Sequence, residues 1–186
     1  MTDEDFEYIE TLPFTMDIYP QGAAPFTACH SSPRGARDPI CHDERQISEC
    51  LALIKTDYMF CGHQHMVRTY CHLKKRAYFV GSVGLCDGIG GHAQFAYAEF
   101  TGGQWLARTV AIPYDVERAV GEFETSGLIN CGCTWSRGVK YMARTGYDAS
   151  VELLRRTRAL ACADGISGAI PEKYWRRAAA DMGLSE

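Results

Sequence analysis

The first part of the chain consists of short apolar runs. Residues 3–12 repeat apolar positions at helical spacing and stop before Pro13, which predicts a short helix. The apolar runs at 14–19 and 25–29 are separated by a Pro-Gln-Gly sequence typical of a turn. We therefore expect these runs to form two strands of a hairpin.

A helical segment and another strand come next. Between residues 43 and 55 the apolar positions follow the i, i+3, i+4, i+7 spacing of an amphipathic helix, at Ile47, Cys50, Leu51 and Ile54. Residues 57–61 then form an apolar run that Gly62 ends. Strand, helix and strand in this order predict a βαβ crossover, with the two strands parallel and adjacent.

Three histidines follow the strands of this crossover. His30 comes after the first strand, and His63 and His65 come after the second. The carboxyl ends of parallel strands share one sheet edge, where α/β folds place ligand sites. Two histidines this close in a loop are as often plain polar residues as ligands, but convergence with His30 favours metal ligation. Neutral imidazole suits divalent manganese, iron, cobalt, nickel or zinc.

Another strand and a hairpin are predicted farther along. Residues 76–80 form an apolar run that leads into the small-residue loop 81–84. Residues 93–100 and 105–112 alternate apolar and polar positions around a Gly-Gly turn, which predicts an antiparallel hairpin.

After Pro113 the apolar period changes from two to 3.6 residues. We expect helices near residues 116–127, 134–145, 149–162 and 171–182. The chain is thus predicted to be an α/β domain over residues 1–112, followed by a helical extension over 113–186.

Composition and charge narrow the class of protein. Of the 186 residues 46% are hydrophobic, enough for a core, and the net charge is −4. Lys and Arg form no concentrated basic run, which argues against binding of nucleic acid. No apolar run reaches the roughly 20 residues of a transmembrane helix, so no membrane association is expected. The acidic first residues do not resemble a secretory signal, and we expect a cytoplasmic location.

The nine cysteines leave a second interpretation open. Without an export signal, reduced thiols are expected rather than a disulfide framework. A structural zinc cluster is the alternative, suggested by Cys29-His30, Cys41-His42, Cys71-His72 and Cys131-Gly132-Cys133. Adjacent side chains of a strand point to opposite faces, so free thiols are favoured.

The other three histidines lie in polar stretches, at His42, His72 and His92. They are expected to be surface residues rather than ligands. Asp87 and His92 share a glycine-rich loop and are candidates for lining a substrate pocket, with solvent exposure as the plainer alternative.

Three motifs resemble those that close the calcineurin-like metallophosphoesterase domain. In this chain they are His30-Ser31-Ser32-Pro33, Gly62-His63-Gln64-His65 and Gly81-Ser82-Val83-Gly84. They are most similar to the small single-domain bacterial branch, which has His-Gly-Ser-Pro, Gly-His-Thr-His and Asn-Pro-Gly-Ser-Val-Gly there. The resemblance covers about residues 4–128. It implies an α/β fold that forms part of a four-layer α/β/β/α sandwich, followed by the helical extension.

The resemblance also implies a function and a set of roles. It implies hydrolysis of small phosphomonoesters or phosphodiesters by a metal-activated water at a centre of two divalent ions. His30 and His63 would bind one ion and His65 the other, with manganese as the first candidate and iron, nickel, cobalt or zinc as others. Gly62, Ser82 and Gly84 would support the site or the substrate.

The chain departs from the family pattern in its first half. The family supplies an Asp-x-His pair, a bridging Asp in Gly-Asp-x-x-Asp, and a Gly-Asn-His-Glu motif whose histidine protonates the leaving group. None of these motifs occurs in this sequence, so no catalytic residue is identified. Three neutral histidines without a carboxylate are a poor ligand set for two dications. We therefore expect this chain alone to bind metal weakly and to hydrolyse little.

Three hypotheses follow from these departures. The first is a phosphoesterase whose front half is missing from this chain, because Met1 lies where the family has the helix leading to Leu-Pro, here Leu12-Pro13. The second is a non-catalytic half-domain that serves as a binding or assembly module, completed by a separate N-terminal half. The third is a Cys/His zinc-binding structural protein. Because a missing half would leave sheet surface uncovered, self-association is also expected.

Overall fold

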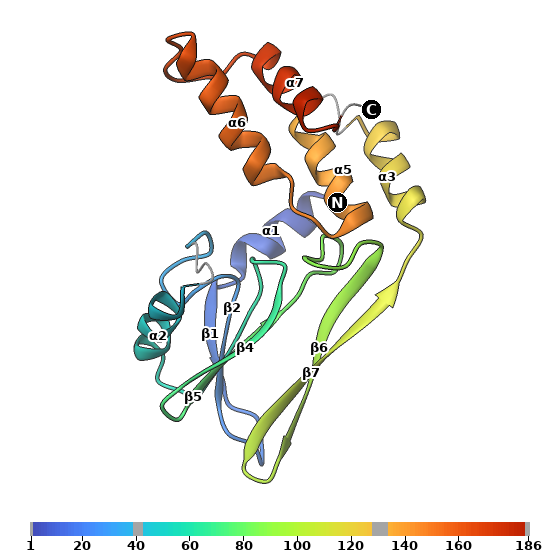
Figure 1. The fold of residues 1–186 in the computed structure, drawn as a ribbon. Helices are drawn as coiled ribbons and strands as arrows, with labels where there is room; N and C mark the ends of the chain where they lie inside the picture. The colour runs from blue at the N-terminus through green and yellow to red at the C-terminus, as the bar shows by residue number, and fades with distance from the viewer. Residues whose placement is uncertain (1, 39–42, 128–133, 185–186) are drawn as a thin grey trace. The chain divides into compact units, whose positions relative to one another are not determined.

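The computed structural model describes residues 2–38, 43–127 and 134–184, and it divides the chain into two compact units. The sheet unit comprises Met1–Ser82 and Phe95–Val110. The helical unit comprises Val83–Gln94 and Ala111–Glu186. Both are drawn in Figure 1, and each is considered by itself. None of the helices in the described ranges is long and apolar enough to cross a membrane.

A five-stranded mixed sheet forms the centre of the sheet unit. Its strand order is β1-β2-β3-β5-β4, with bounds β1 Thr15–Ile18, β2 Phe26–Cys29, β3 Tyr58–Cys61, β4 Val67–His72 and β5 Lys75–Val80. β1 runs antiparallel to β2, and β2, β3 and β5 are parallel. The hairpin predicted from the apolar runs at 14–19 and 25–29 and the predicted βαβ crossover are therefore both confirmed.

β4 is a strand that the sequence pattern does not predict. It pairs antiparallel with β5 from Val67↔Val80 to His72↔Lys75. The two strands are joined by Leu73-Lys74, and Leu73 adopts a positive φ of 53°. Such turns normally carry Asn or Gly, so the sequence shows no turn signal at this point.

Helix α2 (Glu44–Leu53) covers one face of this sheet. Its N-terminus is capped by the Asp43 side chain, which accepts a hydrogen bond from the Arg45 backbone nitrogen at 2.8 Å. The core beneath it consists of Ile47, Cys50, Leu51, Ile54, Met59, Cys61, Ala77 and Phe79. The helix contributes the apolar positions that its sequence spacing predicts.

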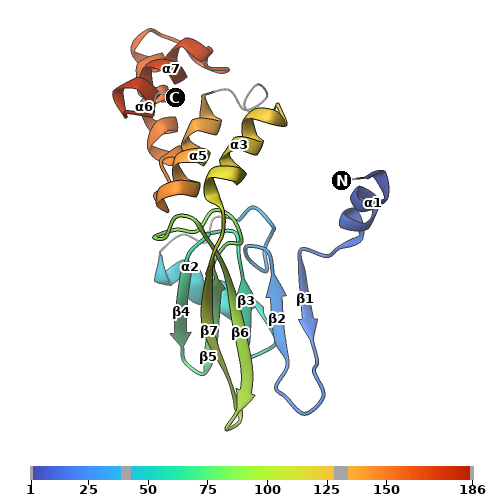
Figure 2. The ribbon, with the colours of Figure 1, turned by 90° about the vertical axis from the view of Figure 1, so that its right-hand side faces the viewer.

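The opposite face of the sheet packs against a β-hairpin. The hairpin consists of β6 (His92–Thr101) and β7 (Gln104–Pro113), which form a two-stranded sheet. The Trp105 ring lies 5.4 Å from the Phe26 ring, and its carbonyl accepts a hydrogen bond from the Tyr78 hydroxyl at 2.6 Å. The sheet unit therefore contains an α/β/β layering, with α2 and the hairpin on opposite faces (Figure 2).

The amino-terminal helix α1 (Asp3–Thr11) has no buried residue. Thr2 and Asp5 form a reciprocal capping box, so the helix end is satisfied locally. Figure 2 shows an extended segment leading from α1 to β1, with the helix away from the sheet. The helix is predicted correctly, yet its apolar side chains Phe6 and Ile9 remain exposed.

Four described helices build the helical unit, as predicted: α3 (Val116–Thr125), α5 (Trp135–Thr145), α6 (Ser150–Ala163) and α7 (Glu172–Asp181). The loop 83–94 packs with them, which the sequence does not predict. The Gly91 nitrogen donates to the Ala143 carbonyl and the Gly88 nitrogen to the Gly146 carbonyl, both at 2.8 Å. A Cβ on Gly146 would lie 2.3 Å from the Ile89 nitrogen, so only glycine permits this approach.

Candidate metal edge

The backbone brings the two histidine loops together at the carboxyl ends of β2 and β3. Cys29 and Cys61 are the last register partners of these strands. The next residue continues the pairing, because the Gly62 nitrogen donates to the His30 carbonyl at 2.9 Å. The His30 nitrogen donates to the Phe14 carbonyl at 3.1 Å. The predicted convergence of these loops on one edge is confirmed.

Two of the three histidines are in direct contact. His63 Nδ1 lies 3.2 Å from His30 Nε2, and the ring centroids are 5.1 Å apart at an interplanar angle of 68°. The two rings thus turn nitrogen atoms toward one another from loops 33 residues apart in sequence. The pair presents imidazole nitrogens at one point of the sheet edge.

The loop after β3 is held in an unusual backbone conformation. His63 has a φ of 65° and His65 a φ of 56°, the left-handed region that non-glycine residues rarely adopt. The Gln64 nitrogen donates to the Gly62 carbonyl at 2.7 Å, which closes a tight turn. Such conformations cost about 1–3 kcal/mol each and gather at functional sites. The left-handed conformation at both histidines turns the backbone away from the direction of β3.

The surroundings favour the neutral form of His63. Partial burial lowers its pKa, and the positive charges that His30 and His65 can carry lower it further. A neutral imidazole keeps a lone pair available for a metal ion.

The histidines could supply part of the ligand set of a metal centre, but they do not complete it. Among the described residues, no three His, Cys, Asp or Glu side chains are grouped so as to hold a metal ion. The contact pair supplies two nitrogen ligands and no carboxylate to balance the charge of a dication. The assignment of His30, His63 and His65 as ligands stays a prediction.

Hydrogen bonds restrain the turn that follows His30. Ser31 and Ser32 are buried, and the Ser31 hydroxyl donates to the Asp38 carbonyl. The Asp38 carboxylate accepts from the Ser32 hydroxyl at 2.6 Å and from Arg34 Nε at 2.7 Å. These bonds, that of Ser32 first, lower the pKa of Asp38. The sequence pattern did not identify Asp38, although its i,i+4 spacing from Arg34 is typical of an ion pair.

The remaining predicted site residues lie in different units. Ser82 ends the sheet unit, whereas Gly84 belongs to the helical unit, where its carbonyl accepts a hydrogen bond from the Tyr114 hydroxyl at 3.0 Å. The supporting roles expected for Gly62, Ser82 and Gly84 stay predictions.

The other histidines differ in their surroundings. His72 is exposed, as predicted. His92 is partly buried, and its Nδ1 lies 2.7 Å from the Gly90 carbonyl oxygen. His42 lies outside the described residues, as do Cys41, Cys131 and Cys133 of the possible zinc cluster.

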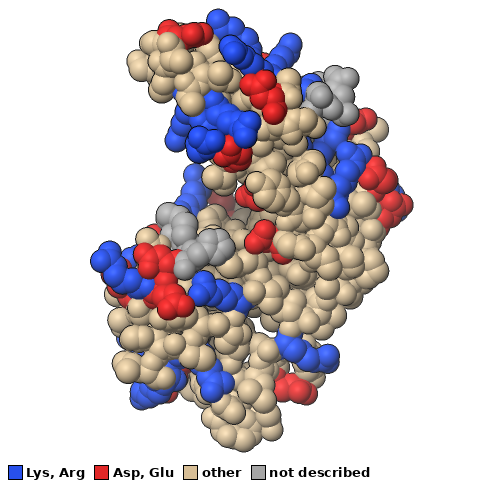
Figure 3. Space-filling view, viewed as in Figure 1, with Lys and Arg blue, Asp and Glu red and all other residues tan. Residues whose placement is uncertain are grey.

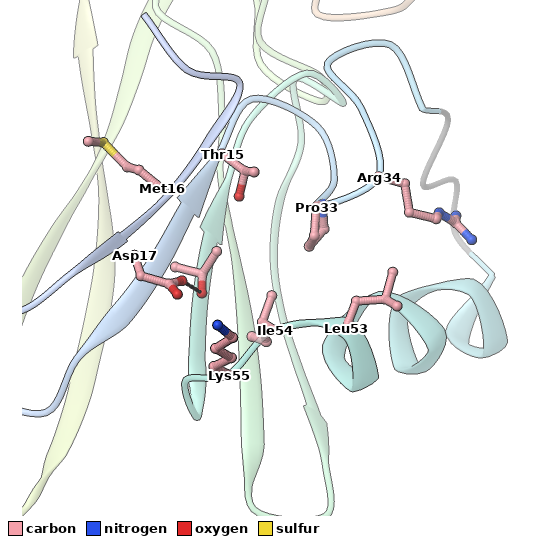
Figure 4. Close-up of a pocket in the computed structure, with 9 residues that line it drawn as sticks. Thr15, Met16, Asp17, Pro33, Arg34, Leu53, Ile54 and Lys55 are labelled. Carbon is pink, nitrogen blue, oxygen red and sulfur yellow. Dashed lines mark hydrogen bonds between the residues drawn. The ribbon is translucent and has the colours of Figure 1, made fainter.

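A hollow of about 440 Å³ opens on the α2 face of the sheet, beside the helix. It is lined by Thr15, Met16, Asp17, Thr27, Pro33, Arg34, Leu53, Ile54 and Lys55. Figure 4 shows the Asp17 carboxylate accepting a hydrogen bond from the Thr27 hydroxyl, at 2.6 Å. The hollow therefore lies over β1 and β2, next to the part of the sheet that α2 covers.

Charged side chains of both signs lie side by side around α2 in the sheet unit (Figure 3). Arg34 and Arg45 both approach the Glu49 carboxylate, at 3.8 Å and 3.3 Å. Exposed pairs of this kind contribute little to stability.

Solved structures of known proteins share this architecture. A metallophosphoesterase from Sphaerobacter thermophilus superimposes with a TM-score of 0.56 at 20% identity, over 68% of this chain and 59% of that one. This chain has a metallophosphoesterase-like fold. A hypothetical protein from Pyrococcus horikoshii OT3 matches with a TM-score of 0.62 at 15% identity, over 78% of this chain and 56% of that one.

This metallophosphoesterase-like chain therefore spans somewhat more than half the length of the two structures. No protein-family model matches the sequence. No curated protein matches it either. The fold is thus recognised through its three-dimensional arrangement.

Proposed function

We propose that this chain supplies the histidine side of a metal-dependent phosphoesterase centre that hydrolyses small phosphate esters. The observation that carries the proposal is the His30–His63 contact, with 3.2 Å between ring nitrogens at the carboxyl edge of parallel strands. His30 and His63 would hold one divalent ion, manganese first, and His65 would face a second. Bound ions of this kind polarise a phosphate and lower the pKa of a bound water.

The chain's own residues favour the neutral form of His63 and restrain the turn that follows His30. The lowered pKa of His63 keeps its lone pair free at neutral pH. The Ser32–Asp38–Arg34 hydrogen bonds restrain the turn that follows His30. These contacts orient ligands in advance, which is how supporting residues raise metal affinity.

Carboxylate ligands and an acid for the leaving group would come from a complementing N-terminal half. Three features support this part of the proposal. The chain spans only 56% and 59% of the solved structures that share its fold. Phe14 and Met16 are exposed, with the Met16 side chain on the face of β1 turned away from α2 (Figure 4), and the hollow beside α2 opens on the other face of β1 and β2. A partner segment that packs along the β1 edge would bury apolar surface and bring the missing ligands.

Metal binding by the chain alone tests the histidine assignment. Calorimetric titration with Mn²⁺ or Zn²⁺ should show weak binding that His63→Ala reduces at least tenfold. His72→Ala, at an exposed position in the same sheet, should leave binding unchanged. Equal binding by the wild type and His63→Ala would refute the assignment.

Two further measurements separate the alternatives. Hydrolysis of a chromogenic phosphodiester with added manganese should be negligible for this chain. The coding sequence before Met1 should contain in-frame Asp-x-His, Gly-Asp and Gly-Asn-His motifs. Their absence would leave the non-catalytic binding module as the better account, and zinc retained after replacement of all three histidines would favour a Cys/His zinc protein.

A further inference from the structure

Two cysteines lie side by side immediately before the histidine loops. Cys29 ends β2 and Cys61 ends β3, and they are register partners in the parallel pair. The Cys61 thiol donates to the Tyr78 carbonyl oxygen at 3.7 Å, and Cys29 packs against the same core that contains Cys61. Neighbouring strands are about 4.8 Å apart, inside the range of about 4.4–6.8 Å between Cα atoms that a disulfide spans.

The two thiols differ in their exposure to solvent. Cys61 is only 2% exposed and belongs to the core under α2, whereas Cys29 is partly exposed at the rim of that core. An oxidant can therefore reach Cys29 first, while Cys61 lies opposite it on the neighbouring strand. Cys50 of α2 lies in the same core and is fully buried.

We propose that Cys29 and Cys61 are a redox modification site, which forms a reversible disulfide between β2 and β3 next to the histidine pair. The inference rests on strand register and on the core that both cysteines share. Only its consequence for metal binding depends on the proposed function.

The chemistry balances with a peroxide as oxidant. The Cys29 thiol reacts with hydrogen peroxide to give a sulfenic acid and one water. The Cys61 sulfur then attacks the Cys29 sulfur, the S–O bond breaks, and the hydroxyl leaves with the Cys61 proton as a second water. In total, two thiols lose two electrons and two hydrogens, and the peroxide is reduced to two waters.

The bond would act on the histidine edge through two short backbone links. His30 follows Cys29 directly, and Gly62 and His63 follow Cys61. The Gly62–His30 backbone hydrogen bond of 2.9 Å spans the same two strands one residue farther on. A covalent link between the partners would change the spacing and orientation of the two rings.

Tryptic mapping without reductant tests the site directly, because the candidate cysteines fall in different peptides. Cys29 is in residues 1–34, Cys50 in 46–55 and Cys61 in 56–68. After brief treatment with hydrogen peroxide and alkylation, we expect peptide 1–34 joined to 56–68, with dithiothreitol restoring both. Cys50→Ser should keep this product and Cys29→Ser should lose it.

Two outcomes would overturn the proposal: a link from 1–34 to 46–55, or Cys29 oxidised to sulfinic acid without any link. The map of the wild-type chain tests the link without a substitution of Cys61. The result therefore does not depend on whether a Cys61 variant folds. As a second readout, the histidine ring resonances of His30 and His63 should shift on oxidation in metal-free protein, while those of His72 stay in place. Unmoved His30 and His63 resonances would refute the effect on the histidine edge.

Discussion

The centre of the sheet and its β1 edge differ in how well they are covered. Met59 of β3, on the face under α2, is 0% exposed, whereas Met16 of β1, on the opposite face, is 49% exposed. The first lies in a core of eight buried residues. The second lies on an edge strand that, among the described strands, pairs only with β2, and the helix that precedes it in the sequence has no buried residue.

This difference shows which part of the fold can stabilise itself. β3 and β5 are covered by α2 on one face and by the β6–β7 hairpin on the other. The histidine loop follows directly after β3. The β1 side has apolar side chains without a covering layer among the described residues. Exposed apolar side chains at an edge strand favour pairing with another chain, so we propose that a complementing segment would bind at this edge.

The largest expected effect tests the covered side. Leu51→Ala should lower the free energy of unfolding by about 2–5 kcal/mol, because Leu51 is 1% exposed and a cavity would remain. Leu53→Ala on the same helix, at 58% exposure, should change it by less than about 0.5 kcal/mol. Urea denaturation of both variants measures the contrast. Similar losses for both would mean that α2 does not pack as described.

A second prediction tests the uncovered side. Replacing Phe14 and Met16 together by lysine should shift the chain from oligomers toward monomers, because charges on an edge strand disfavour pairing with another chain. Light scattering after size-exclusion chromatography measures the mass. Leu73→Lys, at a 91% exposed turn, serves as the control and should leave the oligomeric state unchanged. A wild-type chain that is monomeric at high concentration would contradict the interpretation of this surface.

The smallest expected effect concerns pH at the histidine edge. The pKa of His63 is lowered in the folded chain by burial and by its histidine neighbours, so protonation is easier in the unfolded state. Stability should therefore be fully present above about pH 6.5, the ordinary histidine value, and should fall as pH drops toward the lower folded pKa.

Nuclear magnetic resonance of the His63 ring, with chelator present, measures this shift directly. Its titration midpoint should lie below the value found for the same ring in urea-unfolded protein. Equal midpoints in the two states would show that His63 is not held against its neighbours.

Local sequence patterns were sufficient for much of the fold. The spacing of Ile47, Cys50, Leu51 and Ile54 predicted α2, and the apolar runs around it predicted the parallel pair β2–β3. These patterns succeed because burial repeats with the period of each element. β4 was missed because its turn at Leu73-Lys74 uses a non-glycine residue in a left-handed conformation.

Contacts between distant residues required the structure. Asp38 restrains the turn after His30 through bonds to Ser31, Ser32 and Arg34, and no periodic pattern encodes them. Likewise, the loop 83–94 joins the helical unit because Gly146 allows a close backbone approach to Ile89. Such contacts depend on which surfaces meet.

By itself, the sequence determined the elements other than β4 and the sheet edge at which the histidines collect, because the parallel pairing of β2 and β3 follows from local patterns and the handedness of the crossover. Tertiary structure alone decided that His30 and His63 touch through ring nitrogens, that Cys29 and Cys61 stand in register, and that the β1 side remains uncovered. Each of these depends on distances between atoms far apart in sequence. Side-chain spacing along one strand or helix carries no such information.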